Sequence, residues 1–249
     1  GNGPFTVFAP DNEAFTASGI TSSVVEGLTA DQLKDILLYH TLESRVNAAS
    51  IPTAANTAVK TANGKDVYVT KNNNGVFVNG WKVDQADIMA SNGIIHSIER
   101  VLMPAAGNIV QVAQGNTNLS YLVAAVLRAS QGSTNVAQVL GSAGPFTVFA
   151  PTNQAFIDAG FPTIAAIQAA DPNTLASILT YHVIGARAFS SDLSNGQSLA
   201  TVNGEAITVE LGNTAAVKGK SNTTASRITG MNVMASNGVV HIIDRVLLP

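Results

Sequence analysis

The residues of this chain best suited to chemistry are its four histidines, and they come in two matched pairs. One pair follows a tyrosine, and the other stands three residues after a glycine: Tyr39-His40 and Tyr181-His182, then His96 and His241. An imidazole ring binds metals and exchanges a proton near neutral pH. Two histidines in each half of the chain therefore raise two hypotheses, a metal site and a general base.

The spacing of these residues disfavours both hypotheses. No His-x-His or His-x-x-x-His pattern occurs, no carboxylate stands at a telling distance from a histidine, and the chain has no cysteine. No Gly-x-Ser-x-Gly elbow and no paired acids are present. Gly219-Lys220-Ser221 resembles the end of a phosphate-binding loop, but Thr214 stands where its first glycine belongs. We expect no metal, no cofactor, no catalytic residue and no enzyme.

A structural role fits the histidines better. His40 and His182 lie on an apolar helical stripe at a predicted helix end, where a ring packs and donates to free carbonyls. Contact with a ligand is the alternative. Tyr39 and Tyr181 point off that stripe, so they either face a partner or pin a neighbouring loop through the hydroxyl. The two remaining histidines stand among Ile and Val and are expected to be hydrogen-bonded in the core.

The elements that position these residues form a long internal repeat. The segment Gly3–Pro10 recurs as Gly144–Pro151, and Ala90–His96 recurs with conservative changes as Ala235–His241. A repeat of this length indicates whole domains in tandem, because solenoid units are much shorter. We therefore expect two domains, residues 1–104 and 105–249.

The second copy begins with a stretch, about 107–143, that has no counterpart before Gly3. It is predicted to form two or three helices, one of them capped by Asn118 or Thr117. Its apolar stripe is Leu119, Leu122, Val123, Val126 and Leu127. We expect the first domain to lack its opening helices and the second to be complete. The first would then have an apolar surface that is exposed or covered by a partner, and the sequence would be a fragment of a longer chain.

Each copy is predicted to run from a strand through helices to further strands. The opening strands are 5–9 and 146–150, with Asp11 or Thr152 capping the next helix. A capping box at Thr29-x-x-Gln32 and the pair Asp171-Pro172 start the helices that end at the Tyr-His pairs. Asn-Gly turns separate the later strands, predicted at 66–70, 76–83, 94–102, 206–210, 215–218 and 239–247. In the first closing strand, alternation places Ile94, His96 and Ile98 on one face.

Composition narrows the class of function. Charged residues make up 12% of the 249 residues and the net charge is −3 with no basic cluster, so nucleic-acid binding is not expected. No apolar run is long enough to span a membrane. A surface built from Asn, Thr, Ser and Gln favours an extracellular module over a cytosolic enzyme.

Three motifs, each present twice and in the same order, resemble the fasciclin (FAS1) domain family. They are Thr-Val-Phe-Ala-Pro-x-Asn-x-Ala-Phe, Tyr-His, and Ala-Ser-Asn-Gly-x-x-His-x-Ile-x-Arg-Val-Leu-x-Pro. In the first copy, Asp11-Asn12-Glu13-Ala14-Phe15 completes the first motif. The resemblance implies an α+β fold of two tandem wedge-shaped β-sandwich domains, each with packed helices. It also implies a secreted or surface-attached protein used in adhesion and matrix contact.

The resemblance also implies candidate partner-binding residues. In animal adhesion members, partner contact is placed at the Tyr-His region and at an Asp-Ile-Met stretch. The residues matching these places here are Tyr39, His40, Asp87, Ile88, Tyr181 and His182. Gln85-Ala86 replaces the Glu-Pro usual before the stretch, the second copy has Asn232-Val233-Met234, and no Arg-Gly-Asp occurs.

We therefore expect an adhesion module that binds a protein or polysaccharide at a cell surface or matrix. The two alternatives are a spacer without ligands in a larger surface protein, and a hydrolase that uses the Tyr-His region.

Overall fold

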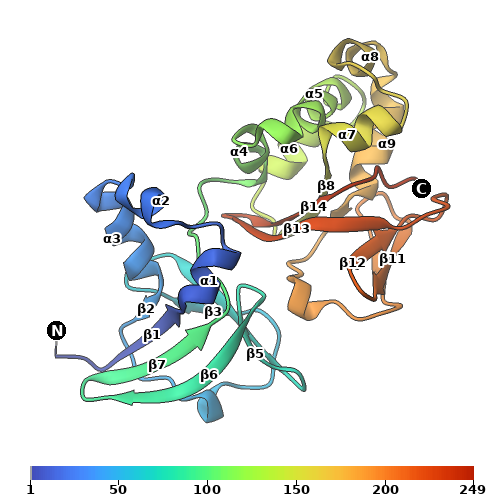
Figure 1. Cartoon of the computed structure of the whole chain (residues 1–249). Helices are drawn as coiled ribbons and strands as arrows, with labels where there is room; N and C mark the ends of the chain where they lie inside the picture. The colour runs from blue at the N-terminus through green and yellow to red at the C-terminus, as the bar shows by residue number, and fades with distance from the viewer. Residues whose placement is uncertain (1) are drawn as a thin grey trace. The chain divides into compact units, whose positions relative to one another are not determined.

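The structure is a computed structural model that describes residues 2–249. It divides into two compact units, shown in Figure 1. Unit 1 comprises the residues up to Pro104 with Ser190–Asp192, and unit 2 comprises Ala105–Phe189 with Leu193–Pro249. Each unit contains a seven-stranded sheet and helices, so the predicted α+β class is confirmed.

The first hundred residues run from a strand through three helices into strands. In chain order they form β1 (Phe5–Pro10), α1 (Asn12–Ala17), α2 (Ser22–Glu26), α3 (Ala30–Tyr39), β2 (Thr41–Leu42), η1 (Ala48–Ser50), β3 (Thr57–Lys60), β4 (Asp66–Asn72), β5 (Gly75–Val78), β6 (Trp81–Ala90) and β7 (Gly93–Ile98).

The rest of the chain repeats this order behind a new helical segment. Its elements are α4 (Ile109–Gln114), η2 (Thr117–Leu119), α5 (Ser120–Ala129), α6 (Val136–Gly141), β8 (Phe146–Pro151), α7 (Asn153–Asp158), α8 (Ile164–Ala169), α9 (Pro172–Tyr181), β9 (Val183–Ile184), η3 (Ser190–Asp192), β10 (Ser198–Ala200), β11 (Ala206–Leu211), β12 (Ala215–Lys218), β13 (Ser226–Ala235) and β14 (Gly238–Ile243).

The sheets of the two units share one topology. Their strand orders are β2-β1-β7-β6-β5-β4-β3 and β10-β11-β12-β13-β14-β8-β9. The first and last long strands pair in parallel, β1 with β7 and β8 with β14, while the other pairs are antiparallel. This parallel pairing brings the first motif of each copy beside its last.

Each sheet folds back on itself into a sandwich. In unit 1, Phe8 of β1 and Ile98 of β7 share a buried cluster with Val67 and Val78 of β4 and β5. In unit 2, Phe149 of β8 shares its cluster with residues of β11 and β12. The long strands β6 and β13, each with register shifts, join the two halves. Bulges of this kind bend a strand and increase its twist.

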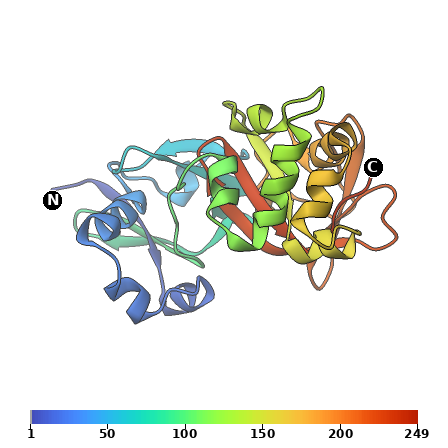
Figure 2. The ribbon, with the colours of Figure 1, turned by 90° about the horizontal axis from the view of Figure 1, so that it is seen from above.

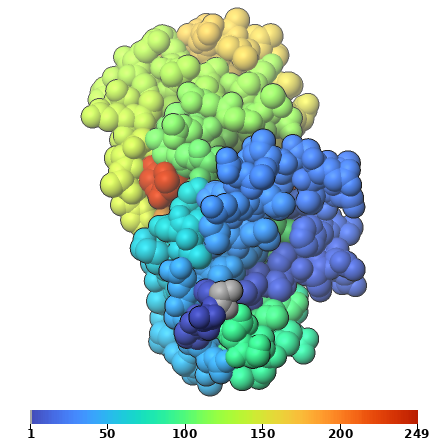
Figure 3. All heavy atoms as spheres, turned by 90° about the vertical axis from the view of Figure 1, so that its left-hand side faces the viewer, coloured from blue at the N-terminus to red at the C-terminus, as the bar shows by residue number. Residues whose placement is uncertain are grey.

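A layer of helices covers the other face of the sheet in unit 2, as the view from above shows (Figure 2). Val148 and Val240 point from β8 and β14 into a cluster with Val126 of α5 and Leu179 of α9. In unit 1 the equivalent of Leu179 is Leu37, whose side chain is 58% exposed against 3% for Leu179. Helix α3, which carries Leu37, lies at the surface in Figure 3. On the apolar stripe of α3, Leu37 is thus exposed, while Leu33 and Ile36 are half-buried and His40 is buried.

Most local signals are confirmed by the structure. Asp11 and Thr152 cap α1 and α7, Thr29 and Gln32 form the capping box of α3, and Asp171 caps α9. The stretch 107–143, predicted to form two or three helices, forms three, α4, α5 and α6. Burial on β7 alternates as predicted for Ile94, His96 and Ile98.

Other predictions are wrong in detail. Helix α5 begins after Leu119, which makes no side-chain cap, while Asn116 caps the preceding 3-10 turn. On α5, Leu127 is 57% exposed, and Ala125 is buried in the stripe instead. The predicted strand 76–83 is two strands, since Asn79 and Gly80 adopt positive φ and turn the chain. The closing strands end near Ile98 and Ile243, short of the predicted 102 and 247.

Candidate functional site

His40 and His182 close their helices through both ring nitrogens. The Nδ1 atoms lie 2.8 Å from the carbonyl oxygens of Ile36 and Ile178, one turn back. The Nε2 atoms accept the backbone N–H groups of Leu102 and Leu247 at 2.9 Å. Because a carbonyl only accepts and an N–H only donates, each ring is neutral with its proton on Nδ1. These contacts leave no lone pair for a metal or a substrate proton.

Burial reinforces the neutral state of both rings. Loss of hydration lowers the pKa of His182 to about 4, an effect that outweighs the hydrogen bond to Ile178, which raises it. Burial likewise lowers the pKa of His40, with an opposing contribution from the Ile36 carbonyl. Low-dielectric surroundings disfavour the charged form of a base. At neutral pH the two rings are therefore uncharged hydrogen-bonding groups.

Tyr39 and Tyr181 point into the sandwich and pin strands through their hydroxyls. The hydroxyl of Tyr39 donates to the Asp66 carbonyl at 3.0 Å and accepts from the Asn79 amide at 3.0 Å. That of Tyr181 donates to the Ala206 carbonyl at 2.7 Å and accepts from the N–H of Lys220 at 2.9 Å. Of the two roles left open by the sequence, the structure shows the pinning one. Both tyrosines are buried, and so are His40 and His182, which follow them.

His96 and His241 hold the bulges of β6 and β13. Their Nδ1 atoms accept the backbone N–H groups of Asp87 at 3.1 Å and Asn232 at 3.3 Å. Their Nε2 atoms lie 2.8 Å from the carbonyls of Val46 and Ala188. Asp87 and Asn232 have φ of 59° and 60°, a region that Asp and Asn tolerate better than most residues. The presence of Asp or Asn at these two positions is therefore explained by the positive φ of the backbone.

One phenylalanine in each unit links its two histidines. Phe8 lies opposite His96 in the β1–β7 register, and the two rings stack with centroids 6.0 Å apart. The backbone N–H of Phe8 donates to the His40 carbonyl at 2.9 Å. Phe149 repeats both contacts with His241 and His182. The structure thus brings the histidines of a unit together around a core strand.

The exposed part of the candidate set is the stretch after the first bulge. The carboxylate of Asp87 accepts the N–H of Ala48 at 2.9 Å, which fixes the neighbouring turn η1. Ile88 is half-buried, and Met89 is 65% exposed on the strand beyond it. Asp87 and Ile88 therefore lie at the surface, whereas Tyr39, His40, Tyr181 and His182 do not.

Sequence reasoning missed the role of the asparagine in the last motif. Asn237 is buried, its Oδ1 accepts the N–H of Ile109, and its Nδ2 donates to the carbonyls of Leu140 and Ser142. One side chain thereby fastens α4 and α6 to the sheet. The repeat identifies its counterpart, Asn92, which is exposed in unit 1.

Within residues 2–249, no group of three or more His, Cys, Asp or Glu side chains is placed to hold a metal ion. No helix in that same range is long and apolar enough to cross a membrane.

Comparison with known proteins gives one family. The model of the fasciclin domain matches residues 1–104 and 119–249. The rabbit (Oryctolagus cuniculus) transforming growth factor-beta-induced protein ig-h3 is 30% identical over 100% of this chain and 35% of its own length. Human periostin is 28% identical over 100% of this chain and 29% of its length. The chain thus spans about a third of these relatives.

A bacterial relative and a solved structure add to this comparison. Protein sll1483 of Synechocystis sp. is 36% identical over 61% of this chain and 79% of its own length. A solved FAS1 domain pair from the insect cell adhesion molecule fasciclin I aligns with a TM-score of 0.49 and 21% identity. That alignment covers 99% of this chain and 89% of the insect chain.

Proposed function

The chain belongs to the fasciclin domain family, and on that premise we propose that it is an extracellular adhesion module without enzymatic activity. Its two domains bind a protein or polysaccharide at a cell surface or in a matrix. Support comes from the adhesive role that the family resemblance implies. It also comes from the composition of the chain, in which only 12% of the residues are charged.

The observation that carries the proposal is the division between buried and exposed motif residues. The Tyr-His pairs use their polar atoms inside the fold, so they act on a partner only by shaping the surface above them. The stretch Asp87–Met89 is presented to solvent by a bulge that His96 fixes. A rigid, partly apolar exposed segment is suited to partner contact. We assign contact with the partner to this stretch.

The hydrolase alternative lacks a working base. A general base must have a free lone pair within reach of the proton it removes. In His40 and His182 that lone pair already accepts a backbone N–H, from Leu102 and Leu247.

The test is a binding screen with the intact chain immobilised, against matrix proteins, cell surfaces and polysaccharides. We expect Met89→Ser to weaken the binding that the screen finds by about tenfold, a typical loss for a central contact. Met103→Ser is the matched control, because Met103 is also exposed, at 49%, but lies outside the stretch. Equal effects of the two substitutions would refute the assigned contact. No binding to any partner would favour the spacer alternative.

A further inference from the structure

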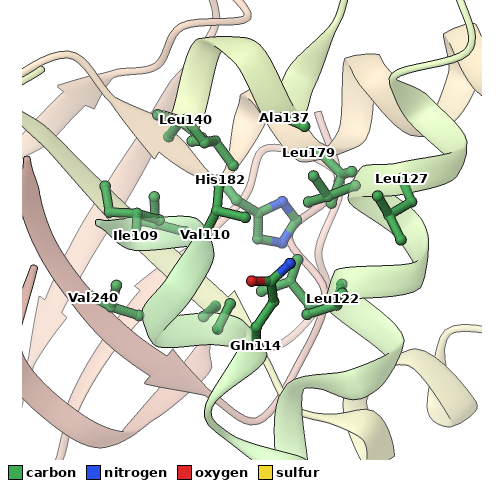
Figure 4. A pocket seen from close by; sticks show the side chains of 16 residues that line it. Ile109, Val110, Gln114, Leu122, Leu127, Ala137, Leu140, Leu179, His182 and Val240 are labelled. Atoms are coloured by element: carbon green, nitrogen blue, oxygen red, sulfur yellow. The ribbon is translucent and has the colours of Figure 1, made fainter. Parts of the chain in front are cut away.

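An apolar cavity lies in unit 2 between the helices α4, α5 and α6 and the face of the sheet (Figure 4). Its free volume is about 40 Å³, and the hollow measures about 620 Å³ when the open space at its mouth is included. Its floor consists of buried side chains from five elements and is formed by Ile109, Leu122, Val126, Leu140, Leu179 and Val240. The rim is half-exposed and includes Val110, Ala113, Val123 and Ala137. The cavity is therefore closed below and reachable from solvent between the helices.

The wall of this cavity is aliphatic. Among its lining residues no aromatic ring other than the imidazole of His182 is present, and the remaining side chains except Gln114 are Ala, Val, Leu and Ile. His182 already uses both ring nitrogens on backbone groups, so it contributes only carbon atoms to the wall. Ligand sites are typically apolar hollows with a few polar groups that orient the ligand. The wall is suited to a slender saturated chain, since it offers no ring for stacking.

Gln114 is the polar group at the mouth. Its side chain is exposed, and Figure 4 shows the amide pointing into the cavity toward His182. An amide both donates and accepts hydrogen bonds, whereas no Lys or Arg lines the cavity. A carboxylate placed there would lose hydration without gaining a cation. The mouth therefore favours a neutral head, such as a hydroxyl or an ester, over a carboxylate.

Unit 1 lacks the helices α4, α5 and α6 that supply most of this cavity. Leu37 and His40 occupy the places of Leu179 and His182, but Leu37 is 58% exposed. A ligand there would gain little burial. The two units therefore differ in what they can hold, and one ligand is expected per chain.

From these observations we propose that unit 2 binds the aliphatic chain of a neutral lipid-like molecule between α4 and α5, with its head at Gln114. The site is separate from the adhesive contact assigned to Asp87–Met89, so either assignment can fail without the other.

The test uses octanol and octanoate, which share a chain and differ in the head. The intact chain is titrated with each, and binding is followed by the NMR methyl signals of Leu122, Val126 and Leu140. We expect saturable shifts at these methyls with octanol, one molecule bound per chain, and affinity for octanoate weaker by about tenfold or more. Absence of octanol shifts at these methyls, or tighter binding of octanoate, would overturn the proposal.

Two substitutions fill the cavity from its rim. Ala113→Leu and Ala137→Leu should each weaken octanol binding by at least about tenfold, because the added side chain occupies the ligand's space. Gln138→Leu adds a similar group to α6 at an exposed position outside the cavity and should leave binding unchanged. Thermal unfolding of each variant shows that it is folded, and two filling positions guard against the failure of one. If the two cavity-filling variants are folded and their affinity for octanol equals that of the original chain, the proposed site is wrong.

Discussion

The polar side chains of the signature motifs are used inside the fold. Each Tyr-His pair satisfies backbone groups at a helix end and across the sandwich, and each later histidine satisfies a bulge. A buried backbone group left without a partner costs about 1–3 kcal/mol, so these side chains stabilise the fold by preventing that cost. The spacing of the motifs therefore reflects which buried backbone groups need a hydrogen-bond partner.

Acid should destabilise unit 2 through His182. Its pKa is about 4 in the folded protein against the ordinary 6.5, so the unfolded chain takes up the proton first as pH falls. The stabilisation is complete above pH 6.5 and is lost progressively as pH falls toward 4. Between pH 7 and pH 5 we expect the free energy of unfolding to drop by about 2 kcal/mol from this group. His40, whose pKa burial also lowers, acts in the same direction.

Urea unfolding at a series of pH values measures this effect. Since several carboxylates also change charge in acid, the comparison is with His182→Gln, which removes the titrating group and should flatten the drop. A pH dependence that the substitution leaves unaltered would show that His182 is not its source.

At the scale of elements, the parallel pairing of the first and last strands depends on a glycine. At Gly238 an added Cβ would collide with the backbone carbonyl oxygen of Phe146 on β8, and Gly93 meets Phe5 of β1 in the same way. Backbone atoms paired in a sheet cannot move aside without breaking the ladder. The glycine of the Asn-Gly pair in the last motif is therefore needed for the close approach of the two strands as well as for the turn.

We expect Gly238→Ala to lower the free energy of unfolding by about 2–4 kcal/mol, as other steric insertions into packed interiors do. Gly185→Ala is the control, because nothing lies within 4 Å of a Cβ there and the residue does not have positive φ. Chemical denaturation of both variants measures their free energies of unfolding. Similar losses for the two would mean that the close approach does not matter to stability.

The features that the sequence predicts depend on neighbouring residues, whereas those that it does not predict depend on residues far apart in the chain. Caps such as Thr29 with Gln32 depend on four consecutive residues, and the alternation on β7 depends on one strand, so both are visible in the sequence. The bulges at Asp87 and Asn232 depend on the register of two strands and on a histidine nine residues away. The fastening of two helices by Asn237 depends on residues about a hundred positions away. No local pattern carries such information.

The same reasoning applies to the candidate site. The apolar stripe predicts that Leu37 and Leu179 face the same way, but only the presence of α4–α6 in unit 2 decides that Leu179 is buried and Leu37 exposed. The Tyr-His pairs were candidates for a partner because motif recognition identifies residues that matter without saying why. Hydrogen-bond partners supply the reason.

At the scale of the whole molecule, the two units differ in how much apolar surface they bury. Unit 2 has buried clusters on both faces of its sheet, whereas the buried cluster of unit 1 lies inside its sandwich. Since burial of apolar surface is the main stabilising contribution, unit 1 should unfold first on heating. The single tryptophan of the chain, Trp81, lies in unit 1 and reports on it alone.

We expect the fluorescence of Trp81 to change several degrees below the main loss of helical circular dichroism, which comes mostly from unit 2. Coincident transitions would show that the two units unfold together. Duplication still serves adhesion under this account, because two weak contacts on one chain raise avidity without new chemistry.

The central claim is that the paired histidines support the fold and that adhesion uses the surface outside them. The most direct measurement compares His40→Ala and His182→Ala with the original chain, in affinity for the partner found by the screen and in melting temperature. At a temperature where all three proteins are folded, we predict unchanged affinity together with melting temperatures lower by several degrees. Loss of binding with an unchanged melting temperature would contradict the account.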